Sequence, residues 1–102
     1  MNIQFKKGVL DLFVLAMLKK CDQYGYDISE SISEKIQISS GTIYPILRKL
    51  KDDGYLTTYL SEESNGPVRK YYQLTKLGEK QYEKLKIEWL ELIKITQYFL
   101  ED

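Results

Sequence analysis

The chain has 102 residues, of which 43% are hydrophobic and 29% charged, a balance typical of one globular domain. Its 15 basic and 15 acidic residues give a net charge of zero, histidine is absent, and Cys21 is the only cysteine. This composition excludes an internal disulfide, a Cys/His zinc site and the histidine-dependent catalytic triads. We therefore expect no catalytic centre, no bound metal and no cofactor, in a protein of the reducing cytoplasm.

The first predicted element is a helix from Val9 to Lys20, which is apolar on nearly every side and must be covered from two directions. Its longest apolar run, Leu12 to Leu18, is far shorter than the ~20 residues that cross a bilayer. Asp11 interrupts the apolar stretch, and Lys19-Lys20 stands where a secretion signal would have its small-residue cleavage site. We expect a buried helix and no membrane partner.

The second predicted element is a short amphipathic helix from Tyr24 to Ile36. Its isoleucines recur every four residues at Ile28, Ile32 and Ile36, the spacing of one helical face. Tyr24 and Tyr26 at its start either pack internally or contact a phosphate, and the sequence leaves both readings open.

The third predicted helix lies in SSGTIYPILRKLKDDGYL, Ser39 to Leu56, and contains a proline. Apolar residues occupy one helical face: Ile43, Ile46, Leu47 and Leu50. A helix beginning at Ser39 would set the Pro45 ring against the carbonyl of Gly41, which costs ~3 kcal/mol or loosens the first turn. We therefore expect Thr42 to cap the helix, or else a loosened first turn, and Gly54 to mark its end.

The start of this third helix is a candidate anion site, because hydroxyls and unpaired backbone N–H groups gather at a helix N-terminus. From Ser39 through Lys51 the segment holds three cations and no anion. Arg48 lies here, and Arg69, the other arginine of the chain, follows the next turn. Guanidinium groups bind phosphates and guanine edges. Alternatively, Arg48 pairs with Asp52 and Arg69 covers an edge strand.

A β-hairpin follows, because YLTTYL and VRKYYQL are β-prone and Asn65-Gly66 between them is a tight-turn signal. Glu62 and Glu63 would repel a phosphate backbone, whereas Arg69 and Lys70 would approach it. The tip is therefore either a solvated turn or a DNA contact.

Thr75 caps a final helix that reaches the end of the chain. Its apolar seam recurs at alternating steps of three and four: Tyr82, Leu85, Trp89, Leu92, Thr96 and Phe99. A helix of roughly 40 Å exceeds what the preceding residues can cover, so its surplus face predicts a second copy of the chain. The expected dimer interface comprises Val9, Leu10, Phe13, Tyr82, Leu85, Leu92 and Phe99.

The predicted fold is mainly α with a β-hairpin. It is a winged helix-turn-helix over residues 1–75 followed by a dimerisation helix over residues 76–102. The segments YGYDI, SSGTIYPILRKLKDDGYL and RKYYQLTKLGE resemble, in order and spacing, the hallmark segments of the PadR family of winged-helix transcriptional regulators. The likeness runs from about Val9 to Trp89. It implies a homodimer, joined through its first and last helices, that represses genes until an inducer releases it.

The resemblance places Ser40, Thr42, Tyr44 and Arg48 on the recognition-helix segment and Arg69 with Lys70 on the wing. With the neighbouring tyrosines, hydroxyls and cations, the predicted contacts to double-stranded DNA are Tyr24, Tyr26, Ser39, Ser40, Thr42, Tyr44, Arg48, Lys49, Arg69 and Lys70.

Some small members of that family bind flat aromatic drugs between paired tryptophans of their last helices, and Trp89 holds a comparable place. A planar aromatic or phenolic ligand would then lie against Asp11, Leu12, Leu15, Trp89 and Ile93. In the alternative reading, Trp89 is a core residue of the interface and Asp11 faces water. The competing function is a winged-helix module that binds a protein and not DNA, which the zero net charge and the acidic hairpin tip favour. An enzyme is the least supported class.

Overall fold

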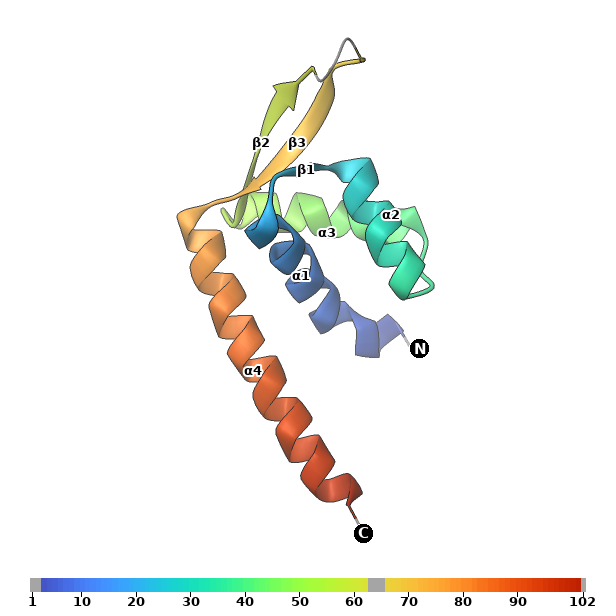
Figure 1. Ribbon diagram of the computed structural model, residues 1–102, viewed down its shortest axis with the longest axis vertical. Coiled ribbons are helices and arrows are strands. Elements are labelled where there is room, and N and C mark those ends of the chain that lie inside the picture. Colours follow the sequence, from blue (N-terminus) through green and yellow to red (C-terminus); the bar gives the residue numbers. More distant parts are fainter. Residues whose placement is uncertain (1–2, 63–65, 102) are drawn as a thin grey trace.

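The computed structural model describes residues 3–62 and 66–101. They form helices α1 (Ile3–Lys20), α2 (Gly25–Lys35), α3 (Ser40–Asp52) and α4 (Lys76–Leu100), and strands β1 (Gln23–Tyr24), β2 (Leu56–Ser61) and β3 (Arg69–Leu74). The sheet order is β1-β3-β2, with antiparallel pairing throughout. Helices α1, α2 and α3 gather beside the sheet while α4 extends away from them (Figure 1). The predicted fold class is confirmed.

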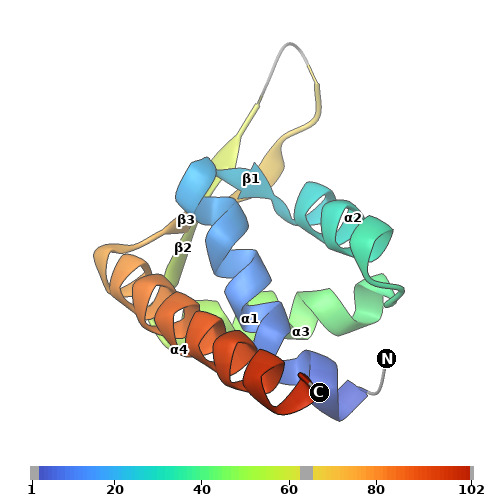
Figure 2. The ribbon, with the colours of Figure 1, turned by 60° about the horizontal axis from the view of Figure 1, so that its bottom comes forward.

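Helix α1 is the centre of the core and contacts α2, α3, α4 and β3. Figure 2 shows it passing between α4 and the pair formed by α2 and α3. Because it is covered on both sides, most of its apolar residues are buried, among them Leu10, Val14, Leu15 and Leu18, while Phe13 and Met17 are half-buried. The helix begins at Ile3, six residues before the predicted start at Val9, because Gly8 lowers helix propensity without ending the helix.

Strand β1 was not predicted, because two residues are too few to show alternation. The helix expected from Tyr24 instead begins at Gly25. Tyr24 is extended, with φ −89° and ψ 158°, and pairs with Tyr71 of β3 while Gln23 pairs with Tyr72. The β-prone tyrosine is therefore used to extend the sheet before α2 begins.

Helix α3 begins at Ser40, with Ser39 as its N-cap, so the later start with Thr42 as cap is wrong. The alternative, a loosened first turn, is not observed either, because the turn is tightened. The Thr42 N–H donates to the Ser39 carbonyl at 3.0 Å, a tight three-residue turn. Pro45 denies the Gly41 carbonyl its helical donor, but both residues are exposed, so water reaches that carbonyl.

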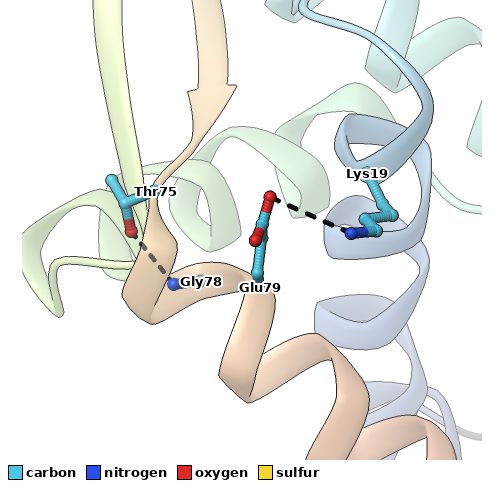
Figure 3. A network of polar contacts seen from close by, with 4 residues as sticks. All are labelled: Lys19, Thr75, Gly78 and Glu79. Carbon is cyan, nitrogen blue, oxygen red and sulfur yellow. Dashed lines mark hydrogen bonds and ion pairs between the residues drawn. The ribbon is translucent and has the colours of Figure 1, made fainter.

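The junction between α3, the sheet and α4 is closely fitted. Gly54 has φ +84°, the left-handed conformation that ends α3. The Thr75 hydroxyl donates to the Gly54 carbonyl at 2.7 Å and accepts from the Gly78 N–H at 3.0 Å. Figure 3 shows this cap, together with the ion pair of 3.9 Å that joins Lys19 of α1 to Glu79. The predicted Thr75 cap is confirmed, and it fixes the direction in which α4 leaves the sheet.

The predicted turn at Asn65-Gly66 and the acidic residue Glu63 fall wholly or partly in residues 63–65, outside the described chain. Within the described residues, the hairpin register runs from Leu56 opposite Leu74 to Ser61 opposite Arg69.

Only the first half of α4 packs on its own chain. Tyr82 and Leu85 pack against the core, whereas every residue from 90 to 101 is exposed. Among the helices described, α1 and α4 included, none combines the length and apolar character that a membrane span requires.

Candidate nucleic-acid interface

A cationic cleft of about 600 Å³ lies between α3, the start of α2 and strand β3. It is lined by Tyr24, Gly25, Tyr26, Tyr44, Arg48, Lys51, Asp52, Arg69, Lys70 and Tyr72. Within that lining, two arginines and two lysines face a single carboxylate. The zero net charge of the chain therefore conceals a local positive excess, the feature that attracts phosphates.

Arg48 is exposed on the flank of α3 that faces the cleft, with Tyr44 one turn before it. No ion pair joins Arg48 to Asp52 within residues 3–62 and 66–101, so the alternative in which Asp52 neutralises Arg48 receives no support. The buried phenol of Tyr72 lies close by: burial raises its pKa, and the Arg48 charge opposes that rise. The guanidinium group is thus available to a ligand in the cleft.

Arg69 reaches the cleft from β3, where its guanidinium carbon lies 4.6 Å from the centre of the Tyr24 ring. A cation over an aromatic face is attracted by the ring quadrupole, which limits the rotamers the arginine samples. The alternative in which Arg69 covers an edge strand is not supported, because β3 lies between β1 and β2 and the guanidinium group of Arg69 lies over the Tyr24 ring.

Tyr24 and Tyr26 are stacked, with ring centres 6.2 Å apart, and their hydroxyls meet acidic partners. Burial, followed by a hydrogen bond to Asp27, raises the pKa of Tyr24, and Arg69 opposes the rise. A hydrogen bond to the Glu30 carboxylate is the main cause that raises the pKa of Tyr26. The internal reading is confirmed, because the rings stack and the phenols are hydrogen-bonded to carboxylates; both rings also line the cleft, and the phosphate contact stays a prediction.

A row of tyrosines crosses the middle of the hairpin. Tyr71 lies 5.9 Å from Tyr24 and is stacked on Tyr59 at 5.6 Å. The Tyr59 hydroxyl and the Gln73 amide both donate to Asp22, at 2.6 and 3.2 Å. The sequence indicated Tyr59 and Tyr71 only as β-prone residues of the hairpin; the contact of Tyr24 with Tyr71 follows from β1, the strand that was not predicted. It braces the hairpin against the start of α2.

The Ser39 and Thr42 hydroxyls at the start of α3 lie outside the cleft lining. Ser39 makes no side-chain capping hydrogen bond, and its hydroxyl lies 3.4 Å from that of Thr42. Ser40 is the first residue of the helix, and the first turn carries no acidic residue. The predicted anion site therefore lies at the N-terminus of α3, apart from the cations of the cleft, Arg48 and Arg69.

Lys49 lies apart from the cleft, although sequence reasoning grouped it with Arg48. Its Nζ lies 2.6 Å from Oδ2 of Asp11 on α1. Asp11 was expected either to contact a ligand or to face water. It is instead paired with a lysine of its own chain.

A second groove, about 310 Å³, runs between α1 and α4. It is lined by Gly8, Val9, Leu12, Leu85, Glu88, Trp89 and Leu92. Of the predicted ligand residues, Leu12 and the half-buried Trp89 line it. Asp11 and Ile93 lie outside its lining, while Leu15 is 0% and the predicted interface residue Leu10 1% exposed. Because the core encloses both leucines, neither offers a surface to a ligand or a partner.

Comparison with known proteins agrees with this geometry. The family model described as "Transcriptional regulator PadR-like family" matches residues 14–84, more than half of the chain. The Bacillus subtilis protein named "Negative transcriptional regulator PadR" is 31% identical over 77 residues, which are 72% of this chain but only 42% of that relative.

Solved structures give the same result over almost the whole length. A PadR-like transcriptional regulator from Bacillus cereus is 31% identical, with a TM-score of 0.90 over 97% of this chain and 98% of that one. The protein smu.1704 from Streptococcus mutans is 45% identical, with a TM-score of 0.80 over 87% of this chain and 82% of that one. The resemblance in the sequence is thereby confirmed, and the chain belongs to the PadR-like family of transcriptional regulators.

Proposed function

We propose that this PadR-like regulator binds operator DNA as a homodimer and represses transcription until a small molecule releases it. The observation that carries the proposal is the cleft in which Arg48, Lys51, Arg69 and Lys70 converge from α3 and β3. A winged helix inserts its recognition helix into the major groove while neighbouring elements contact the backbone. Arg48 at the flank of α3 and Arg69 on the hairpin both carry guanidinium groups, which are suited to binding a backbone phosphate beside the groove.

The homodimer is supported by the exposed outer half of α4. Its apolar residues Leu90, Leu92, Ile93, Ile95, Tyr98, Phe99 and Leu100 are between 37% and 76% exposed. These residues form an exposed apolar stripe over the last 11 residues of α4, roughly 16 Å of a helix about 37 Å long, and exposed apolar surface of this kind commonly marks a protein interface. A second α4 laid along this stripe would cover it and would supply the second recognition helix for a half-site ~34 Å away.

The inducer site is proposed in the groove between α1 and α4, against Leu12 and Trp89. Leu92 of α4 belongs to its lining, so a second copy packed on this helix would help to cover the groove. Its mostly apolar lining suits a planar aromatic or phenolic molecule. Trp89 is the sole tryptophan, so titration with such compounds should quench its fluorescence. Absence of quenching by every compound class would leave Trp89 with a structural role only.

Repression is the sense of regulation that we propose, supported by the printed name of the Bacillus subtilis relative, a negative regulator. A reporter fused to the promoter upstream of the coding sequence should be more active when the protein is absent. Lower reporter activity in its absence would indicate an activator instead.

The DNA-binding proposal is tested by a mobility shift with duplex DNA from upstream of the coding sequence, titrated at several salt concentrations. We expect Arg48→Met to weaken binding and to reduce the salt slope by ~1, because one phosphate contact is lost. Lys84→Met is the matched control: Lys84 is an exposed lysine of α4, outside the cleft, and its replacement should leave both quantities unchanged. Failure of the wild-type protein to bind any duplex at low salt would favour the protein-interaction alternative.

A further inference from the structure

Two adjacent cations of α3, Arg48 and Lys49, lie on different flanks of the helix. Successive residues are turned by about 100°, so Arg48 and Lys49 cannot share one flank. Arg48 lies in the cleft lining with Tyr44 and Lys51, whereas Lys49 does not. From the apolar spacing of the sequence alone, both residues are predicted to lie on the exposed side of the helix, with no difference between them. The structure separates them.

Lys49 pairs with the carboxylate of Asp11, which is largely enclosed and is costly to bury without a partner. Nζ of Lys49 and Oδ2 of Asp11 are 2.6 Å apart, and 19% of the Asp11 side chain is exposed, against 57% for Lys49. Asp11 lies between the buried residues Leu10 and Leu12 on the central helix. A largely enclosed carboxylate is costly unless it is paired, and among the residues described Lys49 is the hydrogen-bond and ion-pair partner of its side chain.

The pair joins the helix at the centre of the core to the helix that is proposed to read DNA. Apolar packing of α1 on α3 is non-directional, so by itself it resists sliding of one helix along the other only weakly. The ion pair adds a directional contact to this packing. It also neutralises a positive charge that would otherwise be offered to a phosphate.

We infer that Lys49 is a positioning residue for DNA binding: by holding Asp11 it fixes α3 on α1, so that Arg48 and Lys51 face the duplex, and it contacts no phosphate itself. This inference rests on the proposed DNA binding.

The first test compares the salt dependence of duplex binding for Lys49→Met and Arg48→Met in the full-length protein. Lys49→Met should weaken binding about 2- to 5-fold at every salt concentration without changing the slope, since a partly exposed ion pair is worth a factor of this size. Lys49→Arg keeps the charge and the reach, and should bind like the wild-type protein. A slope reduced by ~1 for Lys49→Met, as for Arg48→Met, would show a phosphate contact and overturn the inference.

The second test exchanges the charges. Lys49→Glu places two carboxylates together and should weaken binding more than Lys49→Met does. Adding Asp11→Lys to Lys49→Glu restores an ion pair of reversed polarity and should recover most of the lost affinity. If the exchanged protein binds no better than Lys49→Glu alone, the lysine acts on DNA directly and the inference fails.

A third measurement does not use DNA, so it separates this inference from the proposed function. Urea denaturation should give an unfolding constant about 2- to 5-fold larger for Lys49→Met than for the wild-type protein, and an unchanged constant for Lys84→Met. If the wild-type protein binds no duplex but this difference appears, the proposed function fails and the bracing contact stands. An unchanged unfolding constant for Lys49→Met would refute the bracing contact.

Discussion

At the scale of single residues, Gly78 determines how closely α4 approaches the sheet. A Cβ atom at this position would lie 2.1 Å from the Tyr55 carbonyl oxygen and 2.7 Å from the Leu74 side chain. The backbone carbonyl cannot yield cheaply, because Tyr55 also accepts the Thr75 N–H at 3.1 Å. Any side chain at position 78 must therefore push α4 away.

We predict that Gly78→Ala lowers the free energy of unfolding by about 2 kcal/mol, in the range observed for overpacked sites, despite the higher helix propensity of alanine. Urea denaturation measures the loss. Gly41→Ala is the control, because a Cβ atom there would make only an ordinary contact of 3.6 Å with Ser39. Equal stability of the two variants would contradict the close approach at Gly78.

The tyrosines at the cleft predict a loss of stability at high pH. The pKa values of Tyr24, Tyr26 and Tyr72 are raised above the ordinary 10.0. The folded state thus holds these protons more tightly than the unfolded state, and the resulting stability is fully present below pH 10 and is lost as pH rises through the raised pKa values. Thermal denaturation across this window should show the decline, and Tyr26→Phe should make it shallower. An identical decline in Tyr26→Phe would count against the Glu30 contact.

The two arginines that composition indicated, Arg48 and Arg69, both line the cleft, and their contact with DNA stays a prediction. Lys49 could not be separated from Arg48 by sequence. Its partner Asp11 is 38 positions away, and whether a lysine pairs internally depends on tertiary packing that no local pattern encodes.

At the scale of elements, strong hydrophobic periodicity predicted the helices and the hairpin. The exact start of α3 and the short strand β1 depend instead on tertiary contacts. Helix α3 follows its apolar face, yet begins earlier than Pro45 suggested, because the proline lies on the exposed side where an unpaired carbonyl meets water. Strand β1 needed β3 as a template, so its pairing could not be foreseen from two residues.

The start of α3 gives a prediction at this scale. Pro45→Ala restores an N–H that donates to the Gly41 carbonyl. Proline in a helix interior costs ~3 kcal/mol relative to a residue that can make this hydrogen bond. Proline offsets part of that cost by restricting the unfolded chain, worth about 0.4–1 kcal/mol, and water offsets more. We expect Pro45→Ala to raise the free energy of unfolding by about 1 kcal/mol in urea denaturation. A clear loss of stability would show that the proline is accommodated without an unpaired carbonyl.

At the scale of the whole molecule, two surfaces of the described residues are not covered by packing within the single chain. One is the cationic cleft and the other is the apolar outer half of α4, which projects away from the body of the protein (Figure 1). The heptad-like seam predicted the second surface from sequence, whereas the first depended on bringing α3, α2 and β3 together. A twofold partner on α4 would give one assembly two such clefts.

The dimer is tested by sedimentation at micromolar concentration. We expect the wild-type protein to sediment as a dimer and Leu92→Lys to shift it to the monomer, because a charge would be buried in an apolar seam. Lys84→Glu, on the same helix but outside the seam, should remain dimeric. A folded wild-type monomer at this concentration, or a dimer undisturbed by Leu92→Lys, would refute the proposed interface.

The most direct test of the central claim is a crystal structure of the protein with a duplex from its upstream region. The account predicts two copies joined through α4, with each α3 in a successive major groove and a backbone phosphate between Arg48 and Arg69 of each copy. A complex in which the two clefts face directions that no single duplex can reach, or in which DNA contacts a different surface, would contradict it.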